Sequence, residues 1–266
     1  MKQYDTRRCA IRRKRRLTGD VFDFTVDAGD LAGISRAGQF AQIYVPGKTL
    51  RRPISICEAD PENRALRFVI QVRGEGTAVL AGLEEGDSFD LLAPLGTGFE
   101  PGDTSRRALF VGGGIGVPPL LGAAKPFGGN AVLAAGFRSG DAVILKEDFE
   151  AAGCEVRIAT DDGSFGRRGL VTELLGATEF DVIFACGPRP MLRAVSRLAD
   201  ERGVPCQVSL EERMACGVGA CLGCAVRLRG AAGEFYGRVC RDGPVFDSRS
   251  VVWENGTERR AASWQT

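Results

Sequence analysis

Residues 108–119 read ALFVGGGIGVPP, an apolar run that ends in a glycine-rich turn and is followed at once by two prolines. The apolar run predicts a buried strand, and proline suits the first turn of a helix because its missing N–H would have no partner there. Glycines between a strand and a helix let a pyrophosphate approach the backbone closely. The stretch departs from the strict G-x-G-x-x-G form, so a tight connection without a ligand stays the alternative. The candidate nucleotide-binding residues are Gly112, Gly113, Gly114 and Gly116.

Outward from this turn, short apolar runs alternate with helix-like segments. The runs are 108–113, 131–137, 154–160 and 180–187, and the helix-like segments are 118–125, 144–153, 170–176 and 190–203. Nearly continuous apolar strands that alternate with helices predict a parallel sheet covered on both faces. We therefore expect a doubly wound, parallel-sheet nucleotide domain over residues 104–206.

Two more strand ends of this domain carry candidate ligand contacts. Residues 185–191 read ACGPRPM, and ligands of open α/β sheets bind outside the carboxyl ends of the strands. Cys186, as a catalytic residue, and Gly187 and Pro188 are thus expected beside a nicotinamide; a buried cysteine before a proline-capped helix is the alternative. At another strand end, the Asp161 carboxylate would bind ribose hydroxyls and repel a 2′-phosphate, which favours NAD over NADP.

The first hundred residues read as strands separated by turn signals. The expected strands are 9–17, 21–28, 38–45, 51–58, 66–72 and 89–96. Every second residue is apolar in Phe22, Phe24 and Val26, the pattern of a strand with one buried face. Six such strands predict a small antiparallel barrel over residues 1–103, so the fold class is α/β plus β.

Two segments of the expected barrel suit a flavin. Arg52-Pro53-Ile54-Ser55 lies on a strand, where Arg52 would neutralise phosphate charge and Ser55 would hydrogen-bond near the isoalloxazine. Gly74 and Gly76 would let a phosphate approach, and Thr77 begins a helical stretch whose free N–H groups favour an anion. Taken singly, each segment also fits an ordinary turn or strand edge.

Four cysteines near the C-terminus carry the most specific signal. Cys216, Cys221 and Cys224 form C-x4-C-x2-C, and Cys240 follows sixteen positions later, which is the spacing of a plant-type [2Fe–2S] ligand set. A four-cysteine zinc site and disulfides are the alternatives. We expect an iron–sulfur domain over residues 207–254 and a disordered polar tail over residues 255–266.

Composition excludes several classes of function. The chain has no histidine, which removes Rieske ligation, Ser-His-Asp hydrolysis and imidazole general-base chemistry, so bound cofactors are expected to carry the chemistry. No apolar run is long enough to span a membrane, and the N-terminus lacks the apolar core of a secretory signal, so a reducing, cytoplasmic setting is expected. The basic run at residues 12–16 has strand-like flanks in a chain of net charge +1, which argues against nucleic acid as a partner.

In this order the motifs resemble the ferredoxin–NADP reductase superfamily, and within it the electron-transfer subunits of NAD-dependent (class 1B) dihydroorotate dehydrogenases. The matching segments are Arg52 to Ser55, Gly74 to Thr77, Pro94 to Gly96, Gly112 to Pro119, Asp161 to Ser164, Cys186 to Met191 and the four cysteines. Where many of these reductases carry Arg-x-Tyr-Ser, this chain has Ile54, so no ring stacks on the flavin from that position.

The resemblance implies FAD, a [2Fe–2S] cluster and NAD as cofactors, and a separate FMN-containing dihydroorotate dehydrogenase catalytic subunit as partner, joined in a heterotetramer. Electrons from dihydroorotate would pass through the cluster and FAD to NAD⁺ in pyrimidine biosynthesis. A related reductase subunit serving a hydrogenase, a sulfur reductase or an oxygenase is the alternative enzyme. A zinc-binding, non-catalytic regulatory protein is the alternative of another class.

Overall fold

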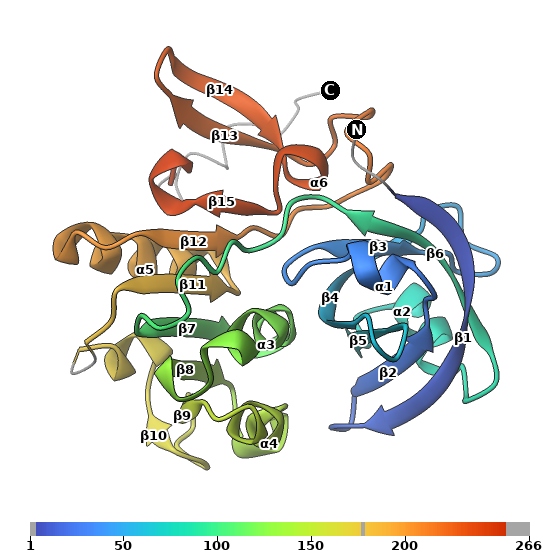
Figure 1. The fold of residues 1–266 in the computed structure, drawn as a ribbon, viewed down its shortest axis with the longest axis horizontal. Helices are drawn as coiled ribbons and strands as arrows, with labels where there is room; N and C mark the ends of the chain where they lie inside the picture. The colour runs from blue at the N-terminus through green and yellow to red at the C-terminus, as the bar shows by residue number, and fades with distance from the viewer. Residues whose placement is uncertain (1–3, 177–178, 254–266) are drawn as a thin grey trace, which may run out of the picture.

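A computed structural model describes residues 4–176 and 179–253. A β-barrel lies on one side of the molecule and a helix-covered sheet on the other, and the C-terminal segment crosses above both (Figure 1). The tail expected over residues 255–266 lies outside the described residues.

The N-terminal part is a closed barrel of antiparallel strands in the order β1-β2-β5-β4-β3-β6. Its elements are β1 (Asp5–Arg16), β2 (Val21–Asp27), α1 (Leu31–Ile34), β3 (Phe40–Ile43), β4 (Arg52–Asp60), β5 (Ala65–Gln71), α2 (Glu75–Ala81) and β6 (Ser88–Leu95). Phe24, Val26, Phe68 and Ile70 fill the interior, because alternate residues of each strand point inward. The expected six-stranded antiparallel barrel is confirmed.

The second part is a seven-stranded sheet in the order β10-β9-β8-β7-β11-β12-β15. Its elements are β7 (Ala108–Gly113), η1 (Gly114–Gly116), α3 (Pro118–Ala124), η2 (Lys125–Asn130), β8 (Ala131–Phe137), η3 (Gly140–Ala142), α4 (Lys146–Ala151), β9 (Glu155–Thr160), β10 (Arg167–Arg168), η4 (Val171–Leu174), β11 (Val182–Cys186), α5 (Arg189–Arg202), β12 (Cys206–Ser209) and β15 (Val245–Asp247). The sheet is parallel except at β15, which runs antiparallel to β12. The expected helix over 170–176 is a single 3₁₀ turn, η4.

The two faces of this sheet bury alternate residues of β7. Phe110 packs in one core with residues of α3 and α4, whereas Leu109 and Val111 pack in the other with Leu192 and Val195 of α5. Helices therefore cover both faces of the sheet, and the doubly wound arrangement is confirmed.

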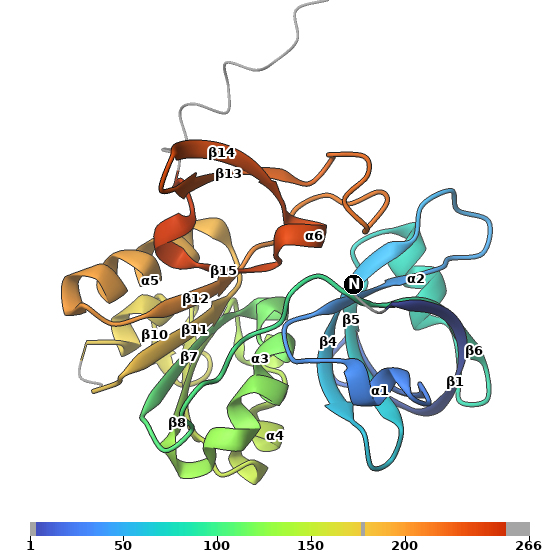
Figure 2. The same cartoon turned by 45° about the horizontal axis from the view of Figure 1, so that its top comes forward.

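The C-terminal segment adds a hairpin, β13 (Ala225–Gly230) and β14 (Gly233–Arg238), and a short helix, α6 (Val239–Asp242). After α6 the chain returns as β15 to the edge of the sheet and ends its described part beyond η5 (Ser248–Ser250). Figure 2 shows the hairpin above β15, with the cysteine loop reaching toward the barrel. The expected boundary between residues 206 and 207 falls inside β12, because that strand belongs to the sheet and the iron–sulfur segment begins after it.

Candidate functional site

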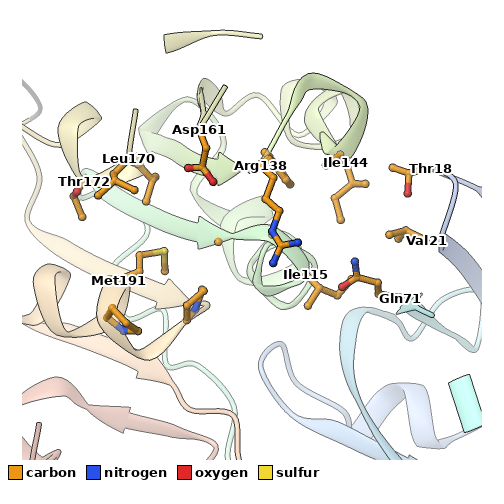
Figure 3. Close-up of a pocket in the computed structure, with 18 of the residues that line it drawn as sticks. Thr18, Val21, Gln71, Ile115, Arg138, Ile144, Asp161, Leu170, Thr172 and Met191 are labelled. Atoms are coloured by element: carbon orange, nitrogen blue, oxygen red, sulfur yellow. The ribbon is translucent and has the colours of Figure 1, made fainter. Parts of the chain in front are cut away.

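A cavity of about 700 Å³ separates the barrel from the sheet domain. Thr18, Val21 and Gln71 line it from the barrel side, and Asp161 and Met191 line it from the other (Figure 3). On the sheet side the cavity lies at the carboxyl ends of the parallel strands, where open α/β sheets bind nucleotides. Among the predicted nucleotide residues, four line it: Gly113, Gly114, Asp161 and Pro188.

Four of the predicted nucleotide glycines, Gly113 of the cavity wall among them, allow close packing within and between two loops. A Cβ built on Gly116 would lie 2.3 Å from the carbonyl oxygen of Cys186, and one on Gly113 would lie 2.7 Å from the Pro188 ring. A Cβ built on Gly112 would lie 2.6 Å from Val117. One built on Gly187, whose φ is +153°, would lie 2.8 Å from the Met191 methyl. The glycine-rich turn and the Cys-Gly-Pro segment therefore support each other directly.

Gly114 lies where the expectation puts it, whereas Cys186 does not line the cavity. Gly114 has φ +54° and nothing within 4 Å of its missing side chain, so it leaves open space at the cavity. The Cys186 side chain is 2% exposed, and burial raises the pKa of its thiol. Cys186 does not line either of the two cavities, so a catalytic role for it stays a prediction.

Arg138 is a lining residue that the sequence analysis missed. It directly follows β8, as Asp161 directly follows β9, and both side chains point into the cavity (Figure 3). An arginine here would bind a phosphate of the nucleotide, whereas the Asp161 carboxylate would accept from ribose hydroxyls. The sequence could have indicated Arg138, because it directly follows an apolar strand, as Asp161 does.

A second cavity, of about 230 Å³, lies between the barrel, the start of α3 and the chain that leaves β12. Four predicted flavin residues line it: Pro53, Ile54, Ser55 and Thr77. Its other walls include Pro118 from α3 and Leu210 and Met214 from the chain after β12. Gln71, Arg73 and Ile115 line both cavities, so a group in the small one would meet a group in the large one.

Arg52, Gly74 and Gly76 lie beside this cavity rather than in its wall. The Arg52 guanidinium lies over Gly76, where a Cβ would approach its Nε to 2.5 Å, so a larger residue there would push the guanidinium aside. Helix α2 begins at Glu75, earlier than expected, and the Thr77 hydroxyl accepts from the N–H groups of Arg73 and Gly74. An arginine held over a helix start fits a flavin phosphate.

The four predicted ligand cysteines gather as two pairs. The Cys216 side chain lies beside that of Cys221, the Cys224 side chain lies beside that of Cys240, and Cys216 and Cys240 are close enough to interact electrostatically. In the described part of the chain, no group of three or more His, Cys, Asp or Glu side chains is placed to hold one metal ion. Two pairs match a binuclear cluster, in which each iron takes two protein ligands, better than a single zinc with four.

Backbone N–H groups point at these sulfurs. The Ala220 N–H donates to Cys216 Sγ over 3.3 Å, and the Cys240 N–H donates to Cys224 Sγ over 3.4 Å. Burial alone would raise the pKa of Cys216, but hydrogen bonds from Cys221, Val218 and Ala220 outweigh it and lower the pKa to about 6. The loop therefore favours thiolate at Cys216, the form that binds iron, whereas burial and the neighbouring Cys224 raise the pKa of Cys240 to about 12.

Two glycines shape the cysteine loop. Gly217 has φ +73°, and its missing side chain would strike the Gln42 side chain of β3 at 2.7 Å. Gly219 has φ +84°, and a Cβ built there would lie 2.6 Å from the Arg241 side chain. Because other residues would be strained and crowded at both positions, the loop fits a tightly wrapped cluster.

Comparisons with known proteins agree with this geometry. A family model described as the iron-sulfur cluster binding domain of dihydroorotate dehydrogenase B matches residues 211–252. The "Dihydroorotate dehydrogenase B (NAD(+)), electron transfer subunit" of Caldanaerobacter subterraneus subsp. tengcongensis is 43% identical over 245 residues, 90% of this chain and 95% of that one. The protein of the same name from Bacillus caldolyticus is 42% identical over 255 residues, 92% of this chain and 98% of that one.

The chain belongs to the family of dihydroorotate dehydrogenase B electron transfer subunits. Among solved structures, that of an NADH-dependent reduced ferredoxin-NADP oxidoreductase, studied for flavin-based electron bifurcation, matches with a TM-score of 0.79 and 31% identity, covering 95% of this chain and 92% of that one. A ferredoxin reductase in carbazole 1,9a-dioxygenase matches with a TM-score of 0.62 at 22% identity, over 76% of this chain and 67% of that one, and so shares the fold.

Membership of the dihydroorotate dehydrogenase B electron transfer subunits agrees with the two-cavity arrangement and the cysteine pairs. In the described residues of this family member, no helix is long and apolar enough to cross a membrane. All nine cysteines are free.

Proposed function

We propose that this chain carries electrons between a partner dihydroorotate dehydrogenase catalytic subunit and NAD⁺ in pyrimidine biosynthesis, using a [2Fe–2S] cluster and FAD. The observation that carries the proposal is the arrangement of three sites: the small and large cavities share lining residues, and β3, whose Phe40 lines the small cavity, also contacts the cysteine loop through Gln42. FAD exchanges a hydride with nicotinamide and single electrons with the cluster, which is the chemistry that links the two ends.

The chain's own residues position these groups. Arg52 and the start of α2 would hold the flavin phosphates, and Ser55 and Thr77 line the cavity for its ring. Gly114 leaves room for the nucleotide, and Ile115, which lines both cavities, lies where the nicotinamide and the flavin would meet. Apolar walls at Pro118 and Leu210 would keep water away from that contact.

The partner is an FMN-containing catalytic subunit, and the complex is a heterotetramer in the cytoplasm. In segment 210–214, which precedes the cysteine loop, Leu210 is buried and Met214 lines the small cavity, whereas Glu211 and Arg213 are exposed. The loop itself turns outward at Cys221 and Leu222, whose side chain is 63% exposed. The catalytic subunit therefore docks over Cys221 and Leu222, where an electron has the shortest way out.

Co-expression with the catalytic subunit tests the proposal. The purified pair is expected to be yellow-brown, to contain two irons and two acid-labile sulfides per copy of this chain, and to form orotate only when NAD⁺ is supplied. A colourless protein with stoichiometric zinc would favour the regulatory alternative. A coloured protein that gives no orotate with that subunit would instead indicate a related reductase with another partner.

A further inference from the structure

Gln42 is a fully buried amide without a partner. Its side chain lies in the middle of β3 with 0% exposure, and among the described residues neither Nε2 nor Oε1 makes a hydrogen bond. Buried polar atoms are nearly always paired, because an unpaired amide loses its bonds to water and gains nothing in return. An orphaned amide at this position therefore indicates that a partner is absent from the protein atoms themselves.

The side chain points out of the barrel and under the cysteine loop. Ala41 and Ile43, its neighbours on β3, belong to the barrel core, so Gln42 must face the opposite side. There it meets Gly217, the residue after Cys216: a Cβ built on Gly217 would lie 2.7 Å from Gln42 Cγ and 3.0 Å from Nε2. The amide is thus within reach of the first ligand of the loop.

Much of what surrounds the amide is apolar. Phe40, Leu95 and Val218 belong to the apolar cluster that fills this junction. Arg51, a nearby cation, donates to the backbone oxygen of Gln42, and among the described residues no donor bonds the side-chain amide. A leucine or methionine would suit so apolar a place better than glutamine unless the amide binds something.

β3 also links this place to the flavin side. In the register of the sheet, Gln42 lies opposite Pro53, and Phe40 lies opposite Ser55, both on the strand that lines the small cavity. Phe40 lines the proposed flavin site and Gln42, two residues on and on the same face of β3, meets the cysteine loop, so this strand borders both sites.

We propose that Gln42 Nε2 donates a hydrogen bond to a sulfur at the Cys216 end of the bound cluster, and so positions the cluster and raises its reduction potential. The inference rests on the proposed [2Fe–2S] cofactor. Reduction adds negative charge to the cluster, and a donor to its sulfurs stabilises the more negative state.

Redox titration of the cluster in Gln42→Leu tests this inference in the complex with the catalytic subunit. The midpoint potential is expected to fall by about 59 mV, which corresponds to a tenfold change in the one-electron equilibrium between flavin and cluster. Gln207→Leu is the matched control, because that amide already bonds Glu100 in both directions, and it should leave the potential unchanged. Gln42→Met, close in length to glutamine, replaces Gln42→Leu should the latter not fold.

Selective ¹⁵N labelling of glutamine side chains gives a direct readout. A hyperfine coupling between a glutamine nitrogen and the reduced cluster is expected in the wild type and in Gln207→Leu, and should be lost in Gln42→Leu. An unchanged potential with no such coupling, in protein that holds full iron and sulfide, would overturn the inference and indicate a buried water as the amide's partner. Protein without iron and sulfide would instead defeat the proposed function.

Discussion

The barrel meets its two neighbours through junctions of different character. Toward the sheet domain an apolar contact, in which Cys57 of β4 belongs to the same core as Leu120 of α3, is flanked by an ionic network that the other junction lacks among the described residues. In that network Arg67 of β5 bonds Asp23 within the barrel and reaches across to Asp148 of α4 over 2.6 Å. Arg15 makes the same pair of contacts, and Lys125 reaches back to Glu58. Beside this polar network lies the large cavity, open to the nucleotide.

Toward the iron–sulfur segment the contact is apolar and uses the backbone. Gly96 is packed against Pro244 so closely that a Cβ would come within 2.5 Å of its ring, and the Thr97 N–H donates to the Gly243 carbonyl. Charged pairs across a cleft can adjust with little change in energy, whereas close-packed apolar surfaces have one arrangement. We infer from this difference that the nucleotide side can exchange its ligand, whereas the cluster side keeps a fixed distance between the proposed cluster and the proposed flavin.

Cys221→Ser should give the largest effect, and only on the cluster side. We expect loss of the iron–sulfur absorbance and of orotate-linked NAD⁺ reduction, because a hydroxyl is a poor iron ligand. NADH oxidation with a small artificial acceptor should stay within about twofold, since the nucleotide and flavin sites lie elsewhere. Absorbance spectra and steady-state rates measure both, and loss of the flavin together with the cluster would show that the junctions are not independent.

Gly116→Ala should damage the nucleotide side next most strongly. Its Cβ would overlap the Cys186 carbonyl, and backbone cannot yield as a side chain does. We expect a loss of roughly 1–3 kcal/mol in the free energy of unfolding, as for other overpacked sites, and a raised KM for NADH. Gly114→Ala is the control: it meets no neighbour but adopts φ +54°, at a cost of about 1 kcal/mol. Equal losses in the two variants by chemical denaturation would refute the close contact.

Asp148→Asn should weaken the ionic junction by roughly 1–2 kcal/mol at neutral pH, since the site is half-buried and Asp23 still faces Arg67. We expect a raised KM for NADH and no change in the cluster potential. Glu150→Gln, which breaks an exposed pair with Lys146 on the same helix, is the matched control and should cost about 0.5 kcal/mol or less. A shifted cluster potential in Asp148→Asn would contradict the separation of the two junctions.

The same variant has a pH signature. Burial alone would raise the pKa of Asp148, but the charges and hydrogen bonds of Arg67 and Arg15 hold that pKa below its ordinary value. The unfolded carboxylate, with a pKa of about 3.9, therefore binds protons before the folded one does. The stabilisation is complete above that pH and is lost as pH falls through the folded pKa, so the acid slope of the unfolding free energy should be smaller in Asp148→Asn.

The barrel and the sheet were predictable because their patterns are local. β7 and β8 begin and end where the apolar runs do, since strands buried on both faces need continuous apolar sequence. The β13–β14 hairpin was missed because its second strand, with exposed Phe235 and Tyr236, shows no alternation of burial. β15 was missed because three residues carry no period.

The site was predictable in its motifs but not in their contacts. Spacing identified the cysteines, but only the fold shows that Gln42, more than 170 positions earlier in the chain, lies under their loop. Likewise, a Gly-rich motif does not reveal which glycine faces a ligand: Gly114 is open and Gly116 is packed against backbone. Such distinctions depend on long-range packing, which a single sequence does not display.

Asp161→Asn should give the smallest effect, at the large cavity between the barrel and the sheet domain. The variant keeps a hydrogen-bonding side chain and loses one charge at a solvent-filled cavity, which is worth about 1 kcal/mol, so the preference for NADH over NADPH should fall about fivefold. KM values for the two nucleotides measure this.

Arg138→Ala tests which phosphate the arginine binds. If Arg138 binds the pyrophosphate common to both nucleotides, its loss weakens the binding of NADH and NADPH equally. If Arg138→Ala weakened NADPH alone, the arginine would be reading the 2′-phosphate, and Asp161 would not be what sets the preference for NAD.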